Sequence, residues 1–312
     1  AVEAGADSVY CGLRDETNAR NFPGLNFDAG ELAQAVTDCH RRGAKVLVAI
    51  NTFARAGDEA RWRRSAETAL EAGADAIIAA DLAVLAHVRA LSPTARLHLS
   101  VQAAANTPEA IAFYAETFGV RRVVLPRGLS AQEIARLVAD VATEVEGRVF
   151  GGLCVMAEGR CALSSYATGQ SPNLAGVCSP PEAVSFERSA AGMPTRLAGL
   201  ALDHAPAGKT VGYPTLCKGR FAVEGEASYL FEEPTSLNAM GLLAELRAAG
   251  VHAVKIEGRQ RGKAYVARVT RAFRSAIDAL DRGESTAPFE HLLTDLAEGG
   301  RETAGAYNKR WR

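Results

Sequence analysis

The chain has 312 residues, and its 35 basic and 36 acidic side chains leave a formal net charge of −1. This near-neutral balance argues against a protein that binds nucleic acid over a broad basic surface, although it is compatible with a local basic patch. With 48% apolar and 23% charged residues, the composition is that of a globular protein with a sizeable core. No apolar run of about 18 residues and no secretory signal is visible, and we expect a cytoplasmic protein.

A short pattern recurs along the chain and suggests its architecture. Residues 3–10, 71–78 and 249–256 each combine a helix end, a glycine suited to a left-handed cap and a short apolar strand. Repetition of this unit predicts helices that alternate with parallel strands. Because the chain opens inside such a unit, we expect one more strand and most of a helix to precede Ala1.

The predicted elements follow one another as strand and helix. Strands are expected at 8–11, 45–50, 76–79, 97–101, 122–125, 148–153 and 253–256. Helices are expected at 30–43, 58–72, 82–91, 107–117, 130–143 and 264–280. Seven strands, with an eighth before the chain start, predict a TIM-like (β/α)8 barrel whose first strand is missing from the chain. A doubly wound open sheet is the alternative, but no Gly-x-Gly-x-x-Gly motif follows the first strand.

The stretch 154–235 interrupts the alternation and is rich in Gly, Pro, Ser and Thr. We interpret it as a cysteine-rich insertion after the seventh strand of the barrel. Residues 1–153 and 236–280 would form the barrel, and residues 281–312 would form a C-terminal tail. The whole chain is expected to be one structural domain. The insertion would leave the carboxyl end of a strand, where barrel enzymes place their active sites. So long a loop calls for something that cross-links it.

Four of the six cysteines lie in this insertion: Cys154, Cys161, Cys178 and Cys217. Four thiolates can bind either an iron–sulfur cluster or a structural zinc ion. Zinc sites are usually built from closely spaced Cys-x2–4-Cys pairs, whereas these cysteines are separated by 6, 16 and 38 residues. The wide spacing favours a [4Fe–4S] cluster and leaves zinc open. Three basic residues are adjacent to these cysteines: Arg160, Lys218 and Arg220. They would either offset the negative charge of a cluster or be ordinary surface residues.

The remaining cysteines and the histidines give no metal-ligand pattern. Cys11 ends a predicted strand and Cys39 lies in a predicted helix, so both are expected to be buried apolar residues. The six histidines are spread along the chain and are expected to be surface or core residues; His98 faces a strand end near Gln102. No Gly-x-Ser-x-Gly or His-Glu-x-x-His motif is present.

Polar residues at the carboxyl ends of the predicted strands are the candidates for substrate contact: Asn51, Asp81, Gln102, Arg127, Lys255, Glu257 and Arg259. Within this set the candidates for a catalytic role are Arg127, Lys255, Glu257 and Arg259. Either Arg127 or Arg259 could bind a carboxylate with two parallel hydrogen bonds. The alternative is that these side chains form polar layers that close the mouth of the barrel.

Residues 158–173, 213–220 and 255–260 closely resemble the collagenase-like peptidase family. Further stretches are most similar to the ubiquinone-biosynthesis, UbiU-like branch of that family: 15–20, 50–54, 100–102, 124–127 and 232–238. The similarity runs from the first residue to the end of the chain.

This resemblance implies that Cys154, Cys161, Cys178 and Cys217 bind a [4Fe–4S] cluster. It also implies a heterodimer with a homologous, UbiV-like subunit, and oxygen-independent hydroxylation of the aromatic ring of ubiquinone precursors with prephenate as oxygen donor. Hydroxylation of RNA bases by the same fold, a non-catalytic cluster scaffold and a peptidase are the alternatives. No nucleophile–base arrangement supports the peptidase.

Overall fold

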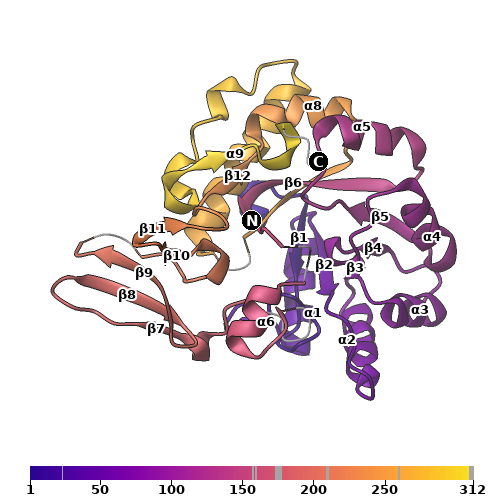
Figure 1. The fold of residues 1–312 in the computed structure, drawn as a ribbon. Helices are drawn as coiled ribbons and strands as arrows, with labels where there is room; N and C mark the ends of the chain where they lie inside the picture. Colours follow the sequence, from indigo (N-terminus) through magenta and orange to yellow (C-terminus); the bar gives the residue numbers. More distant parts are fainter. Residues whose placement is uncertain are drawn as a thin grey trace.

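A parallel β-sheet with helices packed along its outer face forms the body of the protein in the computed structural model (Figure 1). The structure describes residues 1–22, 24–156, 158, 160–172, 178–208, 211–258 and 261–308. Six strands follow each other in sequence and in space: β1 (Ser8–Cys11), β2 (Lys45–Ile50), β3 (Ala76–Ala79), β4 (Leu97–Leu99), β5 (Val120–Val124) and β6 (Glu144–Gly152). Each pairs with the next in parallel register.

Three later strands complete this sheet. They are β12 (Ser236–Asn238), β13 (Ala253–Ile256) and β14 (Glu302–Thr303). β13 pairs with β6 in parallel register, whereas β12 pairs antiparallel with the last residues of β6. β14 extends the sheet by pairing in parallel with β12.

Six of the helices around the sheet occur where the sequence predicts them, whereas the short helix at Leu243–Ala248 was not predicted. Together they are α1 (Ala29–His40), α2 (Glu59–Glu71), α3 (Leu82–Leu91), α4 (Pro108–Phe118), α5 (Ala131–Asp140), α8 (Leu243–Ala248) and α9 (Lys263–Asp281). Side-chain caps define several starts: capping boxes begin α1 at Asp28 and α5 at Ser130. Asp81 accepts hydrogen bonds from the amides of Ala83 and Val84 in the first turn of α3, and Thr107 caps α4 ahead of Pro108. These caps supply partners for amides that the helices leave free, and so they set the exits from the strands.

The two faces of the sheet differ in chemistry. Val46, Val48 and Ile50 of β2 point to the main core, which the helices complete with fully buried side chains such as Trp62. On the opposite, inner face, Leu47 of β2 belongs to a small apolar cluster. Further along the sheet this inner face becomes charged, with His98, Glu146 and Lys255 meeting there.

In a sheet covered by apolar layers on both faces, each strand is a continuous apolar run. Among the described strands of this sheet, β2 and β3 come nearest to that pattern. In β6, polar and apolar residues alternate because one face contacts helices and the other a polar interior.

The described strands form an open sheet, so the structure supports only part of the barrel prediction. Within the described ranges no hydrogen-bonded ladder joins β1 to β13, so these strands are the two edges of the parallel array. The mostly parallel sheet and its outer helices are as predicted, whereas a closed barrel is not shown. The predicted strand at 97–101 extends two residues beyond β4, because residues 101–103 form a 3-10 helix.

The insertion contains secondary structure that its composition did not predict. A short helix, α6 (Ala162–Thr168), is followed by an antiparallel sheet of β7 (Val184–Phe186), β8 (Gly192–Leu197) and β9 (Leu200–Pro206). A hairpin of β10 (Arg220–Val223) and β11 (Glu226–Tyr229) comes next. Figure 1 shows the β7–β9 sheet extending away from the parallel sheet. None of the described helices is both long and apolar enough to cross a membrane.

Candidate functional site

The four insertion cysteines come from four separate segments. Cys154 directly follows β6, and Cys161 is the N-cap residue of α6. Cys178 lies shortly before β7, and Cys217 sits in a single 3-10 turn, Leu216–Lys218, before β10. All four are free thiols, Cys154 and Cys178 with exposed surface and the other two half-buried. The end of β6 thus places the first of these thiols at the carboxyl edge of the parallel sheet.

Electrostatic coupling shows that the four thiols are neighbours. The pKa of the Cys217 thiol is raised to about 12, first by lost hydration and then by Cys154, with Cys178 contributing further. Lost hydration also raises the pKa of Cys178, to which Cys154 and Cys161 add. The Cys154 thiolate therefore disfavours ionisation of both Cys178 and Cys217, as expected for groups that share one region. A cationic group bound between them would reverse this balance.

The coordination geometry is not preformed for one ion. Among the described residues, no three His, Cys, Asp or Glu side chains converge closely enough to hold a single metal ion. The donor set fits a sulfur-ligated centre through its chemistry and its location.

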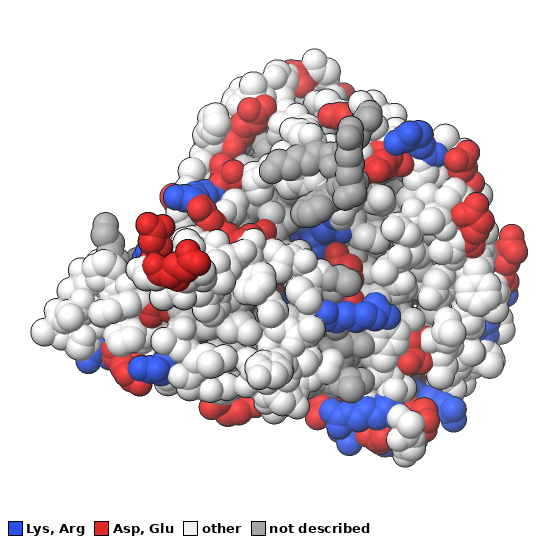
Figure 2. All heavy atoms as spheres, in the orientation of Figure 1, with Lys and Arg blue, Asp and Glu red and all other residues white. Residues whose placement is uncertain are grey.

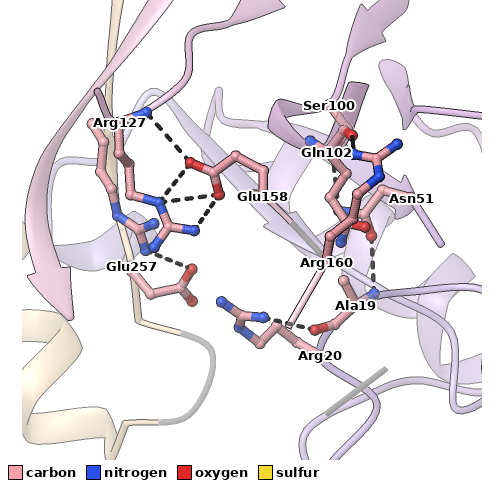
Figure 3. A network of polar contacts seen from close by, with 10 residues as sticks. Ala19, Arg20, Asn51, Ser100, Gln102, Arg127, Glu158, Arg160 and Glu257 are labelled. Carbon is pink, nitrogen blue, oxygen red and sulfur yellow. Dashed lines mark hydrogen bonds and ion pairs between the residues drawn. The ribbon is translucent and has the colours of Figure 1, made fainter. Parts of the chain in front are cut away.

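A buried ion pair lies beside the cysteines. Arg127, in the loop after β5, meets Glu158, which lies between Cys154 and Cys161 (Figure 3). Arg127 Nε donates to both carboxylate oxygens, at 2.8 and 3.1 Å, and Nη2 donates to Oε2. The backbone amide of Arg127 donates to Oε1 at 3.3 Å. Burial lowers the pKa of Arg127, but the hydrogen bonds and charge of Glu158 outweigh it and leave the pKa raised.

A second pair involves Glu257, which follows β13. Its Oε2 accepts from Nη2 of Arg148 at 3.1 Å, so the predicted candidate Glu257 lies at the same edge of the sheet as Arg127. The candidate Lys255 lies deeper: its Nζ is 2.9 Å from Glu146 Oε1 and 4.1 Å from the centre of the Tyr10 ring. Lys255 therefore belongs to the polar interior of the sheet rather than to its mouth.

Sequence reasoning missed three charged residues of this site: Arg20, Arg148 and Glu158. Arg20 lies within the loop between β1 and α1, which Asn51 holds from the end of β2 while Ser100 orients Asn51 (Figure 3). Asn51 Oδ1 accepts from the amide of Ala19 at 3.0 Å, while its Nδ2 donates to Ser100 Oγ at 3.2 Å. Two signals could have identified these residues. Glu158 lies between two ligand candidates, and Arg148 lies at an inward position of β6.

The other predicted candidates have local structural roles or lie beyond the described ranges. Asp81 accepts from the amide of Ala54 as well as capping α3, so its carboxylate is fully engaged. Gln102 lies in the turn after β4, and its backbone oxygen is 3.5 Å from Nη1 of Arg160. The candidate Arg259 lies outside the described residues.

The basic residues next to the cysteines have protein partners of their own. Arg160 lies 5.4 Å from the centre of the Phe53 ring, and Lys218 pairs with Glu298. Arg220 donates to the carbonyl of Ala227. Of the three, Lys218 has a described influence on a ligand candidate, since its charge lowers the pKa of Cys217 against the effect of burial.

His98 illustrates the electrostatics of the inner face. Burial, reinforced by Arg122, lowers the pKa of His98 to about 4, although Glu146 acts in the opposite direction. Nε of Arg96 donates to His98 Nε2 at 3.0 Å, which requires that nitrogen to be unprotonated. Arg96, Arg122 and Lys255 thus outweigh Glu146 and hold the imidazole neutral. His98 has a structural role in this network, as predicted for the histidines in general.

We expect this histidine to make the fold sensitive to acid. Between pH 6.5 and 4 the unfolded chain takes up a proton at His98 that the folded chain does not. The free energy of unfolding therefore decreases as the pH is lowered through this range. Relative to H98Q, the unfolding free energy of the wild type should decrease by about 3 kcal/mol from pH 7 to pH 4. Urea unfolding of both proteins at several pH values measures this difference, with H291Q as the control at an exposed histidine. Parallel pH profiles for wild type and H98Q would contradict the assignment.

Residues 1–308 match the family model described as peptidase family U32. The tRNA hydroxylation protein P of Escherichia coli (strain K12) is 31% identical over 96% of this chain and 68% of its own length. A 23S rRNA 5-hydroxycytidine synthase of the same strain is 28% identical over 96% of this chain and 41% of its own length. A collagenase of Porphyromonas gingivalis is 28% identical over 91% of this chain and 63% of its own length. The chain thus spans between 41% and 68% of these relatives.

Proposed function

Because the chain belongs to peptidase family U32, several of whose members are named for RNA hydroxylation, we propose that it is the [4Fe–4S] subunit of an oxygen-independent hydroxylase. The proposed substrate is the aromatic ring of a ubiquinone precursor, the proposed oxygen donor is prephenate, and the proposed partner is a UbiV-like homologous subunit. One observation carries the proposal: four free thiols come from four segments, and Cys154, at the carboxyl edge of the parallel sheet, is coupled electrostatically to both Cys178 and Cys217 beside the ion pair of Arg127.

Cys154, Cys161, Cys178 and Cys217 would hold the cluster. A four-iron cluster is larger than a single ion, so it suits thiols that are neighbours without converging on one point. Bound there, it would supply one-electron redox chemistry.

The protein's own residues would position the reactants. Arg127 is oriented by Glu158 and Arg148 by Glu257, which keeps two guanidinium groups rigid next to the thiols. Rigid, preoriented groups bind an anion with little loss of conformational entropy. Arg127 and Glu257 thereby have roles in orientation and charge balance, whereas the contact of Lys255 with Glu146 gives it a structural one.

RNA-base hydroxylation is the second candidate, and the names of the relatives favour it. The charge distribution favours the small-molecule substrate, since acidic and basic side chains are interspersed on the face drawn in Figure 2, without one broad basic area. The formal net charge of −1 agrees with this. Binding of RNA through phosphates would weaken steeply with salt.

The first test is metal analysis of protein purified without oxygen. We expect about four iron and four acid-labile sulfide per chain, and a visible absorption band that bleaches with dithionite. One zinc per chain without sulfide would overturn the redox proposal and leave a structural or binding role.

The substrate is tested by reconstitution with the homologous subunit under anaerobic conditions. Supplied with prephenate, the pair should convert one ring C–H of the aromatic precursor into C–OH, while prephenate gives up its hydroxyl oxygen and takes the two electrons removed from the ring; mass spectrometry detects the added oxygen atom. Hydroxylation of tRNA in its place would assign the chain to the RNA-modifying branch.

A further inference from the structure

Arg20 differs from the other charged residues at the carboxyl edge of the sheet in its lack of an acidic partner. Arg127 pairs with Glu158, and Arg148 pairs with Glu257. Arg20 forms no ion pair with any residue that the structure describes; its Nη1 donates only to the carbonyl of Ala19, at 2.8 Å. A half-buried guanidinium with so few partners is unusual, since charges removed from water normally acquire partners.

Arg20 nevertheless lies close to the paired groups. Burial opposes its charge, while Glu257 and the thiolate of Cys178 favour it and Arg127 disfavours it. Arg148 is also within electrostatic range, since Arg20 is among the groups that lower its pKa after burial. In Figure 3 the guanidinium of Arg20 points from its loop toward Glu257 and Arg127. Glu158 and Glu257 each form an ion pair with another arginine, so among the described residues Arg20 has no carboxylate of its own.

The loop holds this guanidinium firmly in place. The backbone amide of Arg20 donates to Asn18 Oδ1 at 2.9 Å, and its carbonyl accepts from Asn26 Nδ2 at 2.9 Å. The preceding amide, that of Ala19, donates to Asn51 at the end of β2. Three asparagine side chains therefore anchor the backbone on either side of Arg20. Such anchoring is what a binding residue needs to present its side chain at one position.

We propose that Arg20 binds the carboxylate of a small organic anion at the edge of the sheet next to Cys178. The proposal rests on the proposed function for its purpose, because the anion would be a reactant held beside the cluster. Arginine suits this role, since its planar fork can donate two parallel hydrogen bonds to one carboxylate. The half-buried position favours a small anion over a phosphate of an RNA chain, which would be met by exposed basic side chains.

Anion binding can be measured by calorimetry on anaerobically purified protein, with prephenate as the probe and inorganic phosphate as the comparison. We expect R20Q to weaken prephenate binding by about tenfold or more. R20K should fall between the two, because lysine keeps the charge without the fork. R41Q is the control: Arg41 is exposed and pairs with Asp38 at the end of α1, outside this loop, so its loss should leave the affinity unchanged.

Iron and sulfide are measured in the same samples, which separates this proposal from the proposed function. A chain without iron and sulfide refutes the cluster, whatever its affinity for prephenate. A cluster-loaded wild type that does not bind prephenate, or an R20Q variant that binds it as tightly, overturns the role of Arg20. An R20Q variant with unchanged affinity but a shifted cluster potential would make Arg20 a counter-charge to the cluster. Salt-sensitive tRNA binding that R20Q abolishes would replace the small anion by RNA.

R20Q and R20K are first compared with wild type in thermal unfolding, so that lost binding is not confused with lost folding. If R20Q fails to fold, R20K decides: weakened binding by this charged variant supports the two-pronged contact, and unchanged binding overturns it.

Discussion

Cys217→Ala is expected to lose most of the iron, from about four to less than one per chain after anaerobic purification. The remaining thiols come from segments before β7, whereas Cys217 would join the segment after β9 to the proposed centre. A missing ligand opens the cluster to solvent and makes its assembly incomplete. Iron and sulfide analysis with the visible spectrum measures the effect.

Cys39→Ala is the matched control for this substitution. Cys39 is also a free cysteine, but it lies in α1, where Arg42 and Asp38 rather than the four insertion thiols influence it after burial. Full iron content in both variants would remove Cys217 from the ligand set. Loss of iron in both would point to general instability, which thermal unfolding of the two proteins identifies.

Glu158→Ala is expected to lower the free energy of unfolding by about 3–5 kcal/mol. The substitution leaves the guanidinium of Arg127 without its counter-charge at a site where the two side chains are only 15% and 8% exposed. It also removes the contact that holds the segment between Cys154 and Cys161 against the loop after β5. Urea denaturation of the cluster-free protein measures the effect on the polypeptide alone.

The exposed pair between Arg268 and Asp295 provides the control, with side chains 51% and 61% exposed. Asp295→Ala should leave the free energy of unfolding nearly unchanged, because surface ion pairs contribute little. A double variant with apolar residues at both 127 and 158 should recover much of the stability that E158A loses. A loss below about 1 kcal/mol in E158A would show that the buried pair is not what fixes this segment.

The parallel sheet and its helices were predictable because their signals are local. The strands β1, β2, β3 and β13 begin and end where the apolar runs do, and α3 covers the predicted residues 82–91. Caps such as Asp28 and Ser130 mark helix starts in the sequence itself. Each signal depends on residues within about four positions of one another.

The strands of the insertion lack such signals. β8 is the middle strand of its sheet yet contains Pro194, which normally argues against a central strand. The hairpin strands β10 and β11 are mostly exposed, so they show little alternation of apolar and polar residues. Their pairing depends on partners and turns rather than on burial.

The candidate site was predictable for its cysteines and only in part for its charges. Arg127 and Glu257 were found because they follow predicted strands. Arg20 lies in a loop nine residues beyond the end of β1, and its placement depends on Asn51 from a different strand. Contacts between loops that are distant in sequence leave no periodic pattern in either loop.

The insertion leaves the sheet and rejoins it at adjacent positions, so it can vary while the sheet stays the same. Ser236 of β12 is paired with Gly152 of β6, so the long excursion starts and finishes at adjacent positions. For a flexible loop whose ends already meet, doubling the length costs only about 0.6 kcal/mol. Proteins built on this sheet can therefore lengthen, shorten or exchange the excursion while the scaffold stays the same. Changes confined to the insertion can thus alter the chemistry at the carboxyl edge of the sheet during evolution.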